Sequence, residues 1–358
     1  MKTNCLEVII LSKIRVGVNG YGTIGKRIAD AVAKMPDMEL VGIVKVTPDY
    51  GYLVAEQKGI PVYTIKDRID KFKDKGFKVE GTIEDLLEQI EIIVDATPGG
   101  YGFYYKEKYY EKLINKGKLK AIYQGGEKSE VADISFNAYC NAEEALKANS
   151  IRIVSCNTTG LLRVICVLNN AFGVEKVRAT IIRRAADPKE DKRGPVNSVK
   201  LNPPKIPSHH ALDVKTVMPN IDIETAAVIV PTTLMHVHSV YMVLKTKVRV
   251  DEIIDELSNY NRILVIDAEK TGIDSTAKIV EAARDLLRSR YDIPELIIWK
   301  DSIYTRENEL WFLQAVHQES IVVPENIDAI RGLARTDGYP DKSIKLTDSV
   351  LGIGKFLG

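Results

Sequence analysis

The sequence predicts an α/β protein with two domains: a Rossmann-type, doubly wound parallel sheet, followed by an α+β domain with a largely antiparallel sheet. Three observations predict this class. Short β-branched runs alternate with helical stretches from residue 14 to about residue 155. A glycine-rich turn separates the first run from the first helix. Beyond a long apolar helix at 160–171, the pattern becomes rich in strands.

In the first domain, 14–155, five short apolar runs are expected to be buried parallel strands. These runs are 14–18, 40–46, 91–95, 121–124 and 151–154. Helices are expected at 26–35 and 82–88. The second of them has Thr82 as N-cap and Asp85 three residues later.

The second domain, 156–320, is expected to hold six strands and three helices. The strands are 177–183, 224–230, 237–246, 262–265, 295–299 and 310–316, and the helices are 160–171, 251–260 and 275–290. The polar stretch 187–213 predicts an ordered loop near a site. A last helix is expected to begin near Pro324.

Composition narrows the class of protein. The chain has 358 residues, of which 45% are hydrophobic and 28% charged, which is enough for two cores. Because 50 Lys and Arg balance 49 Asp and Glu, nucleic acid is not expected as a partner. Residues 1–13 predict a tail or an added edge strand, and no run is apolar enough to span a membrane. We expect a cytoplasmic protein.

The segment Gly20-Tyr21-Gly22-Thr23-Ile24-Gly25 follows the first strand and opens a helix. This GxGxxG pattern permits a tight turn, close approach of a pyrophosphate and close packing of helix on strand. In this context we predict dinucleotide binding rather than an ordinary glycine turn. The turns at 97–100 and 125–126, the latter including Gly126, follow later strands, where this fold binds its ligand.

Lys45 stands at the end of the second strand, where NAD-binding proteins have Asp or Glu. A lysine can pair with a 2′-phosphate, so NADP is expected to be accepted. Two alternatives remain: Lys45 is a solvated strand end, or Asp49 turns back toward the ribose of NAD. NADP and NAD are therefore both candidate cofactors, and no metal site is expected.

Cys156 is the strongest candidate for a nucleophile. A β-rich run delivers it to the start of the 160–171 helix, where the helix dipole favours a thiolate and backbone N–H groups can bind an oxyanion. The four cysteines show no CxxC pair, which indicates free thiols in a reducing compartment. Cys166 and Cys140 are interpreted as buried structural residues, and Cys5 as a tail thiol. Pairing of Cys140 with another thiol stays open, since hyperthermophiles keep intracellular disulfides.

The sequence resembles the archaeal glyceraldehyde-3-phosphate dehydrogenases in motifs along nearly the whole chain after residue 13. The motifs are VGVNGYGTIGKR, VDATPGG, QGGEK, SCNTTG, PSHH, PTTLMHVH and HQESIVVPENIDAIR. The resemblance implies a homotetramer and a C-terminal helix within 321–358 that returns to the first domain. It also implies phosphorylating oxidation of glyceraldehyde 3-phosphate, with inorganic phosphate as the second substrate.

This chemistry needs a thiolate, a base, a hydride acceptor and two anion sites. The bacterial and eukaryotic relatives carry their base soon after the cysteine helix, but residues 181–184 contain no histidine. The resemblance points instead to His236 as the base. If this stretch is extended, His238 shares its face and either orients it or lines the pocket. Either histidine could also be a satisfied core residue.

The remaining site residues follow from the resemblance and from charge. Ser155, Asn157, His209 and His210 resemble substrate-contacting positions, although the two adjacent histidines could equally be surface residues. Arg163 and Arg183 are candidates for the anion sites because they lie near Cys156 in sequence. The resemblance associates Arg184 with the cofactor side and Gln318 with the nicotinamide.

Two other functions compete with this one. Semialdehyde dehydrogenases and acyl-phosphate reductases share the two-domain plan and the cysteine, but the motifs fit them less well. A non-catalytic redox sensor would bind NADP(H) and report through oxidation of Cys156. Only an enzyme would give phosphate-dependent turnover.

Overall fold

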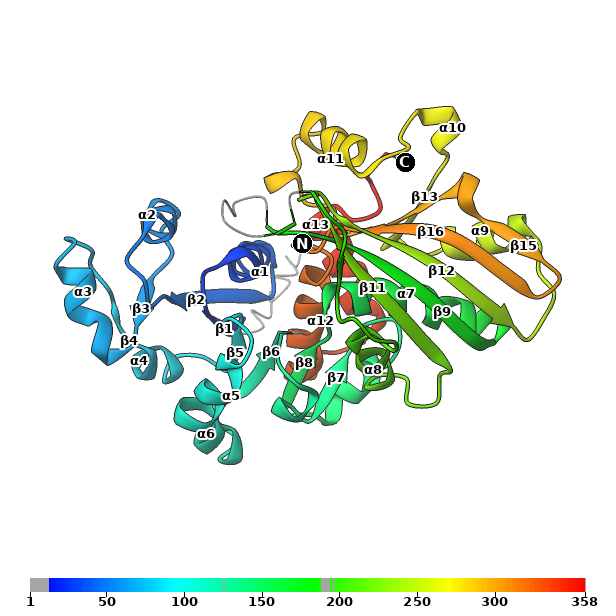
Figure 1. Cartoon of the computed structure of the whole chain (residues 1–358). Helices are drawn as coiled ribbons and strands as arrows, with labels where there is room; N and C mark the ends of the chain where they lie inside the picture. Colours follow the sequence, from blue (N-terminus) through cyan, green and yellow to red (C-terminus); the bar gives the residue numbers. More distant parts are fainter. Residues whose placement is uncertain (1–12, 125, 188–193, 196, 358) are drawn as a thin grey trace, which may run out of the picture.

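The computed structural model describes residues 13–124, 126–187, 194–195 and 197–357. The predicted tail therefore lies, apart from Lys13, outside the described residues. Two β-sheets stand on either side of a central group of helices (Figure 1). Within the described residues, no helix has both the length and the apolar character needed to span a bilayer.

The first sheet has eight strands, all of them parallel. They are β1 (Ile14–Asn19), β2 (Met38–Val44), β3 (Val62–Thr64), β4 (Gly81–Thr82), β5 (Ile92–Asp95), β6 (Lys120–Tyr123), β7 (Ile134–Phe136) and β8 (Ser150–Ile153). Their order is β4-β3-β2-β1-β5-β6-β8-β7, so the chain changes direction beside β1. This confirms the predicted doubly wound sheet, and β1 marks the switch point at which such sheets bind ligands.

Helices cover both faces of this sheet. They are α1 (Thr23–Lys34), α2 (Tyr50–Gln57), α3 (Ile69–Lys73), α4 (Ile83–Leu87), α5 (Tyr101–Tyr105) and α6 (Glu111–Asn115). The predicted capping box of α4 is present: Thr82 N donates to Asp85 Oδ2 at 2.7 Å, and Asp85 N donates to Thr82 Oγ1 at 3.4 Å. Such local side-chain contacts fix where the helix begins.

The second sheet is mixed, with antiparallel pairs in the majority. Its strands are β9 (Val174–Arg184), β10 (Lys200–Leu201), β11 (Ile223–Val230), β12 (His236–Leu244), β13 (Ile263–Ile266), β14 (Leu296–Trp299), β15 (Tyr304–Arg306) and β16 (Glu309–Val316). The pairs β9–β11 and β13–β14 are parallel, and the other pairs are antiparallel. The predicted largely antiparallel sheet is confirmed in this form.

Seven helices accompany the second sheet and the C-terminal part of the described chain. They are α7 (Cys156–Phe172), α8 (His209–Lys215), α9 (Val250–Ser258), α10 (Ala268–Thr271), α11 (Thr276–Asp285), α12 (Val323–Ala334) and α13 (Asp341–Leu351). The expected loop 187–213 was wrong at its end, because His209 begins α8. The expected helix 275–290 was too long: Leu287, Arg290 and Tyr291 have φ of 52°, 54° and 59°, which no α-helix accepts.

Two central helices connect the sheets. Most of α7 is buried, and α12 lies against α1, β6 and β8 in the middle of the molecule (Figure 1). Arg331 on α12 donates to Asp37 in the first domain at 2.7 Å. The C-terminal segment therefore packs on both halves of the chain.

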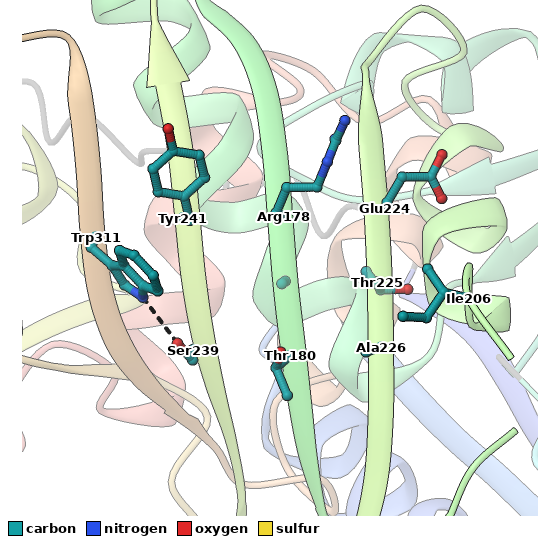
Figure 2. A pocket seen from close by; sticks show the side chains of 10 residues that line it. Arg178, Thr180, Ile206, Glu224, Thr225, Ala226, Ser239, Tyr241 and Trp311 are labelled. Carbon is teal, nitrogen blue, oxygen red and sulfur yellow. Dashed lines mark hydrogen bonds between the residues drawn. The ribbon is translucent and has the colours of Figure 1, made fainter. Parts of the chain in front are cut away.

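One face of the second sheet is open. Figure 2 shows Trp311, Tyr241, Thr180 and Arg178 projecting from neighbouring strands into a shallow depression of about 390 Å³. Trp311 is 50% exposed and donates from Nε1 to Ser239 Oγ at 3.0 Å. The opposite face carries α7 and the buried core.

The expectation of free thiols was wrong for two cysteines. Cys140 and Cys166 form a disulfide that joins the loop after β7 to α7. Sequence spacing did not reveal it, because the partners are 26 residues apart and meet only when α7 packs on the first domain. Cys156 is the free cysteine among the described residues.

Candidate active site

The GxGxxG turn has the geometry that a dinucleotide needs. Gly20 has φ of +94°, and a Cβ there would meet Ala96 O at 2.7 Å. A Cβ on Gly25 would lie 1.8 Å from Gly20 O, so only glycine lets α1 pack this closely. Around Gly22 there is open space, and no side chain caps α1. The free N–H groups at this helix N-terminus suit a pyrophosphate.

A cleft of about 1120 Å³ opens at this turn. Its walls come from the glycine turn, from the residues after β2 and β5, and from the second domain. They include Gly20, Gly22, Thr23, Ile24, Lys26, Lys45, Thr47, Asp49, Thr97, Pro98, Tyr105, Asp187, Arg290, Tyr291 and Glu319. The size and position of the cleft fit a dinucleotide at the switch point of the sheet.

Lys45 lies in this cleft directly after β2, with only 8% of its surface exposed. Its Nζ is 2.7 Å from Asp49 Oδ1, and Asp49 also accepts from Gly51 N as the N-cap of α2. Although burial opposes the change, the contact with Lys45 lowers the pKa of Asp49. The lysine and the acidic residue that the sequence offered as alternatives are thus one ion pair.

Three other predicted cofactor residues, Arg184, Gln318 and Gly126, are not among the residues that line the cleft. Arg184 reaches it through two carboxylates of its wall: Nη2 lies 2.5 Å from Asp187 Oδ1 and 3.4 Å from Glu319 Oε1. Gln318 is 6% exposed, and its Oε1 has no hydrogen-bond partner among the described residues. Such an orphaned acceptor fits a carboxamide N–H₂ donor. Gly126 is in backbone contact with Gly99 and does not line the cleft itself.

Cys156 is the first residue of α7, immediately after the chain leaves β8. Ser155 is the N-cap, and its Oγ accepts from Thr158 N. Cys156 keeps partial exposure and is the free cysteine at the start of this helix. Contrary to the expectation from the helix N-terminus, burial raises the pKa of this thiol, and Arg183, Arg184 and Asn157 N offset only part of the rise.

The two arginines at the end of β9 provide positive charge close to Cys156. Arg183 donates to Asn202 Oδ1, while its Nε is buried without a partner among the described residues. His209 is exposed beside it, and burial followed by Arg183 lowers its pKa. A role of Arg183 and His209 in binding a substrate anion stays a prediction, with which the unpartnered Nε is compatible.

His236 begins β12 and is 4% exposed. Arg184 N donates to its Nδ1 at 3.0 Å. Burial, followed by Arg184 and Arg183, lowers its pKa well below the usual value, so the ring is neutral at neutral pH. Because Nδ1 accepts, the ring proton of this neutral form belongs on Nε2.

Two predicted substrate residues face the interior instead. Asn157 and His210 are each 1% exposed. Asn157 Oδ1 contacts His238 Nε2 at 2.9 Å, and its Nδ2 contacts His210 Nε2 at 3.3 Å. His210 Nδ1 lies 3.0 Å from Ser208 Oγ. Both ring nitrogens of His210 are engaged and Asn157 keeps one further Nδ2–H, so contact of these two residues with a substrate stays a prediction.

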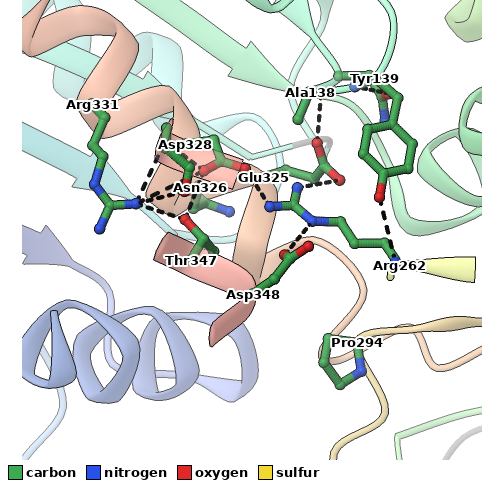
Figure 3. Close-up of polar contacts among 12 residues, drawn as sticks. Ala138, Tyr139, Arg262, Pro294, Glu325, Asn326, Asp328, Arg331, Thr347 and Asp348 are labelled. Atoms are coloured by element: carbon green, nitrogen blue, oxygen red, sulfur yellow. Dashed lines mark hydrogen bonds and ion pairs between the residues drawn. The ribbon is translucent and has the colours of Figure 1, made fainter. Parts of the chain in front are cut away.

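Arg163 is also misplaced by sequence proximity. It is fully buried, and all five N–H groups are used: Glu325 accepts two of them, and the carbonyls of Arg262, Pro294 and Ile321 accept the others. Seven residues beyond Cys156, it lies two turns deeper along α7. Glu325 belongs to the buried charge network that Figure 3 shows around Arg262. Arg163 therefore holds α12 rather than a substrate anion.

Sequence reasoning missed several cleft residues. Arg290 and Tyr291 reach the cleft from the second domain, and nothing local in the sequence marks them. Lys26 lies over the Tyr50 ring at 4.5 Å and is one helical position after the glycine turn, so its charge gave a usable signal. No group of His, Cys, Asp and Glu suited to a metal ion occurs within the described ranges.

The fold and the site define a dinucleotide-binding oxidoreductase with a cysteine at the mouth of its second domain. Two family models match: glyceraldehyde 3-phosphate dehydrogenase, C-terminal domain, over residues 155–302, and dihydrodipicolinate reductase, N-terminus, over residues 14–107. The chain is similar at full length to proteins named glyceraldehyde-3-phosphate dehydrogenase. One from Hyperthermus butylicus is 55% identical over 96% of this chain and 99% of its own length.

Further relatives of the same name agree. One from Sulfurisphaera tokodaii is 54% identical over 96% of this chain and 99% of the relative. One from Aeropyrum pernix is 51% identical over 97% and 100%, respectively. The chain belongs to the archaeal glyceraldehyde-3-phosphate dehydrogenase family, as its motifs indicated.

Proposed function

We propose that this protein catalyses the reversible, phosphorylating oxidation of glyceraldehyde 3-phosphate with a nicotinamide dinucleotide, in glycolysis or gluconeogenesis. The carrying observation is the free, partly exposed Cys156 at the N-terminus of α7, beside Arg183 and Arg184. A dinucleotide cleft in the same chain and the names of its full-length relatives support the assignment.

The chemistry proceeds on the sulfur of Cys156. The thiolate attacks the aldehyde carbon and forms a C–S bond, while the carbonyl electron pair moves to oxygen. The resulting hemithioacetal alkoxide collapses to C=O with loss of hydride from the same carbon, which leaves a thioester. A phosphate oxygen then attacks the thioester carbon, the C–S bond breaks, and the thiolate returns as the acyl phosphate leaves. When bound, the nicotinamide ring supplies the acceptor for that hydride.

The residues around the cleft would hold this cofactor. Gly22 and the N-terminus of α1 suit its pyrophosphate, and Gln318 suits its carboxamide. We expect NADP to be accepted because Lys45 stands where a 2′-phosphate would lie in this fold. Asp49 competes for the same ammonium group, so NAD is expected to bind as well.

Arg183 and His209 are proposed to bind the anionic groups of the substrates. The unpartnered Nε of Arg183 and its charge near Cys156 suit a phosphate at hydrogen-bond distance. Ser155, partly exposed at the start of α7, is proposed to contact the same substrate.

For His236, the proposed role differs from the base that the sequence suggested. With Nδ1 accepting from Arg184 N, the neutral ring presents Nε2–H as a donor. A donor stabilises the hemithioacetal alkoxide but does not abstract a proton. The proton of Cys156 is then lost before attack, when the thiol ionises.

The experiment is reduction of NADP and of NAD at 340 nm with glyceraldehyde 3-phosphate, with and without phosphate or arsenate. Wild type and Cys156→Ser are compared, with Cys5→Ser as a control for loss of a cysteine. Phosphate-dependent turnover that disappears only in Cys156→Ser supports the proposal. Cofactor binding without turnover in folded wild type would instead favour a sensor or a semialdehyde reductase.

We further propose that the protein is a homotetramer, as the family resemblance implied. Light scattering on the eluting protein should then give four times the chain mass of 39.9 kDa. A mass equal to one or two chains would contradict this assembly.

A further inference from the structure

A line of hydrogen-bonded side chains crosses the interior from the second sheet to the turn that carries Cys156. It begins with Gln314 on β16 and His238 on β12, which are directly opposite each other in the antiparallel register. Gln314, His238, Asn157, His210 and Ser208 are each at most 1% exposed. Their polar atoms depend on partners inside the protein, and among them only Gln314 Oε1 has none within the described residues.

The direction of every hydrogen bond in this line follows from its first member. Gln314 Nε2 lies 3.2 Å from Gly160 O, and a carbonyl can only accept, so this atom is the amide nitrogen. The same Nε2 is 2.9 Å from His238 Nδ1, which must therefore accept. The proton of neutral His238 is then on Nε2, and it is donated to Asn157 Oδ1 at 2.9 Å.

The remaining members continue in the same sense. Asn157 has its oxygen toward His238, so its Nδ2 donates to His210 Nε2 at 3.3 Å. His210 consequently carries its proton on Nδ1 and donates to Ser208 Oγ at 3.0 Å. Ser208 Oγ is 2.7 Å from Thr225 Oγ1, which completes the line at β11. We call these five side chains, from Gln314 to Ser208, the relay.

The relay works only with neutral histidines. Burial lowers the pKa of His238 to about 3 and, together with His209, Arg183 and His238, that of His210 to about 2. A protonated His238 would point two donors at each other, since Gln314 Nε2 can only donate. Neither residue is therefore suited to exchange protons with a substrate at neutral pH.

Asn157 is the member that matters for chemistry, because it directly follows Cys156 in the first turn of α7. A second contact from the same side holds the neighbouring residues: Asp213 on α8 accepts from Thr158 Oγ1 at 2.6 Å and from Ser155 N at 3.3 Å. The first turn of α7 is thus held by side chains of β12 and α8, not by its own helix alone.

We propose that Gln314 and His238 are positioning residues that act through Asn157, fixing the first turn of α7 and with it the position of the Cys156 sulfur. This inference rests on the proposed role of Cys156 as the nucleophile. Neither residue touches the substrate. They set the orientation of the Asn157 amide and, through it, the ionisation of the thiol and the geometry of attack.

Three variants and one matched control test the relay, all in a Cys5→Ser background. His238→Phe keeps a ring but removes both hydrogen bonds, and Gln314→Met keeps the length but removes the donor. His238→Gln can still accept near Nδ1 and donate near Nε2. Val240→Ala, on the same face of β12 and fully buried, lowers packing without touching the relay.

The readouts are kcat and KM, the Kd of the cofactor, and the alkylation rate of Cys156 by iodoacetamide against pH, followed by mass spectrometry of its peptide. In His238→Phe and Gln314→Met we expect kcat to fall about 10- to 100-fold, as for small misplacements of reacting groups. The alkylation profile should move to higher pH, since a thiol that shifts away from Arg183 and Arg184 loses part of their stabilisation of the thiolate. Cofactor Kd should stay within about twofold. His238→Gln should recover most of kcat.

If both relay variants behave like Val240→Ala, with lower stability but an unchanged alkylation profile and kcat, the relay is merely part of the core and the inference is overturned. If His238→Phe does not fold, Gln314→Met against Val240→Ala decides the matter alone. Alkylation does not require turnover. A shifted profile in an enzyme that remains active as Cys156→Ser would refute the proposed function, not the relay.

Discussion

At the scale of single residues, the site consists of a few side chains whose electrostatic state is set by burial. Cys156 is held as a thiol by its surroundings, although two arginines oppose this. His236 is held neutral, with its Nδ1 engaged by a backbone amide. The reaction therefore depends on how these groups respond to pH and to substitution.

The first prediction concerns the pH dependence of Cys156. Because its pKa is raised above the usual 9.0, the reactive thiolate is scarce at neutral pH, and kcat/KM should rise tenfold per pH unit through neutrality toward alkaline pH. Arg183→Met removes a charge that lowers this pKa, so the alkylation profile of Cys156 should move to higher pH. Arg178→Met, on the same strand but paired with Asp222, should not move it. A profile centred below pH 8 in the wild type would contradict the raised pKa.

The second prediction distinguishes the two roles of His236. If Nε2–H is a donor to the alkoxide, His236→Gln keeps a donor and should retain at least about tenfold more kcat than His236→Ala, within the range of single oxyanion contacts. If His236 is instead the base, both variants lose kcat equally. Steady-state kinetics at saturating substrate measures the difference.

The third prediction concerns cofactor choice. Lys45→Met should weaken NADP binding about 10- to 100-fold, the usual effect of losing one charge-assisted hydrogen bond. NAD should change by less than about threefold. Asp49→Asn, which releases Lys45 from its partner, should favour NADP further. Equal losses for both cofactors, measured by fluorescence titration, would show that Lys45 only supports the strand end.

At the scale of elements, two helix N-termini organise the site. The uncapped start of α1 faces the cleft, and the start of α7 carries Cys156. The second helix is fixed along its length by α12 through Arg163 and by the disulfide at Cys166. The thiol of Cys156 thus lies on a helix that contacts from two other parts of the chain hold in place.

The fourth prediction addresses that disulfide. It closes a loop of 26 residues, for which chain entropy gives a stabilisation of roughly 3 kcal/mol. Cys140→Ala with Cys166→Ala should lower the free energy of unfolding by about this amount in guanidinium titrations. A reductant should destabilise the wild type but not the double variant. No difference between them under oxidising conditions would mean that the link is not formed in solution.

At the scale of the whole molecule, a buried charge network joins the second domain to the C-terminal helices. Arg262 is fully buried, and it contacts Asp348 at 2.8 Å, Glu325 at 3.5 Å and also Asp328 (Figure 3). Glu325 in turn accepts from Ala138 N of the first domain at 2.7 Å. Both halves of the chain therefore depend on the same buried carboxylates.

The fifth prediction tests this network. Arg262→Met leaves three buried carboxylates without their shared cation, and should cost about 3–5 kcal/mol of unfolding free energy. Arg249→Met breaks an exposed pair with Asp251 that solvent screens, and should leave the unfolding free energy nearly unchanged. Chemical denaturation of both variants measures the contrast. Similar losses in the two would deny the buried network its special weight.

The features that the sequence predicted well are those set by neighbours along the chain. The glycine turn, the Thr82 capping box and the position of Cys156 at a helix start each depend on a few consecutive residues. Strands of two or three residues, such as β4 and β7, carry too little pattern to predict.

By itself, then, the sequence determined the family, the two-domain fold and Cys156 as the candidate nucleophile, because glycine torsions, apolar periodicity and long motifs are local properties. Only the tertiary structure decided where the polar groups of the interior point. It directed Arg163 to Glu325 and Asn157 to two histidines, and it joined Cys140 to Cys166. These partners are distant in sequence, and each buried donor takes whichever acceptor the packing brings within reach.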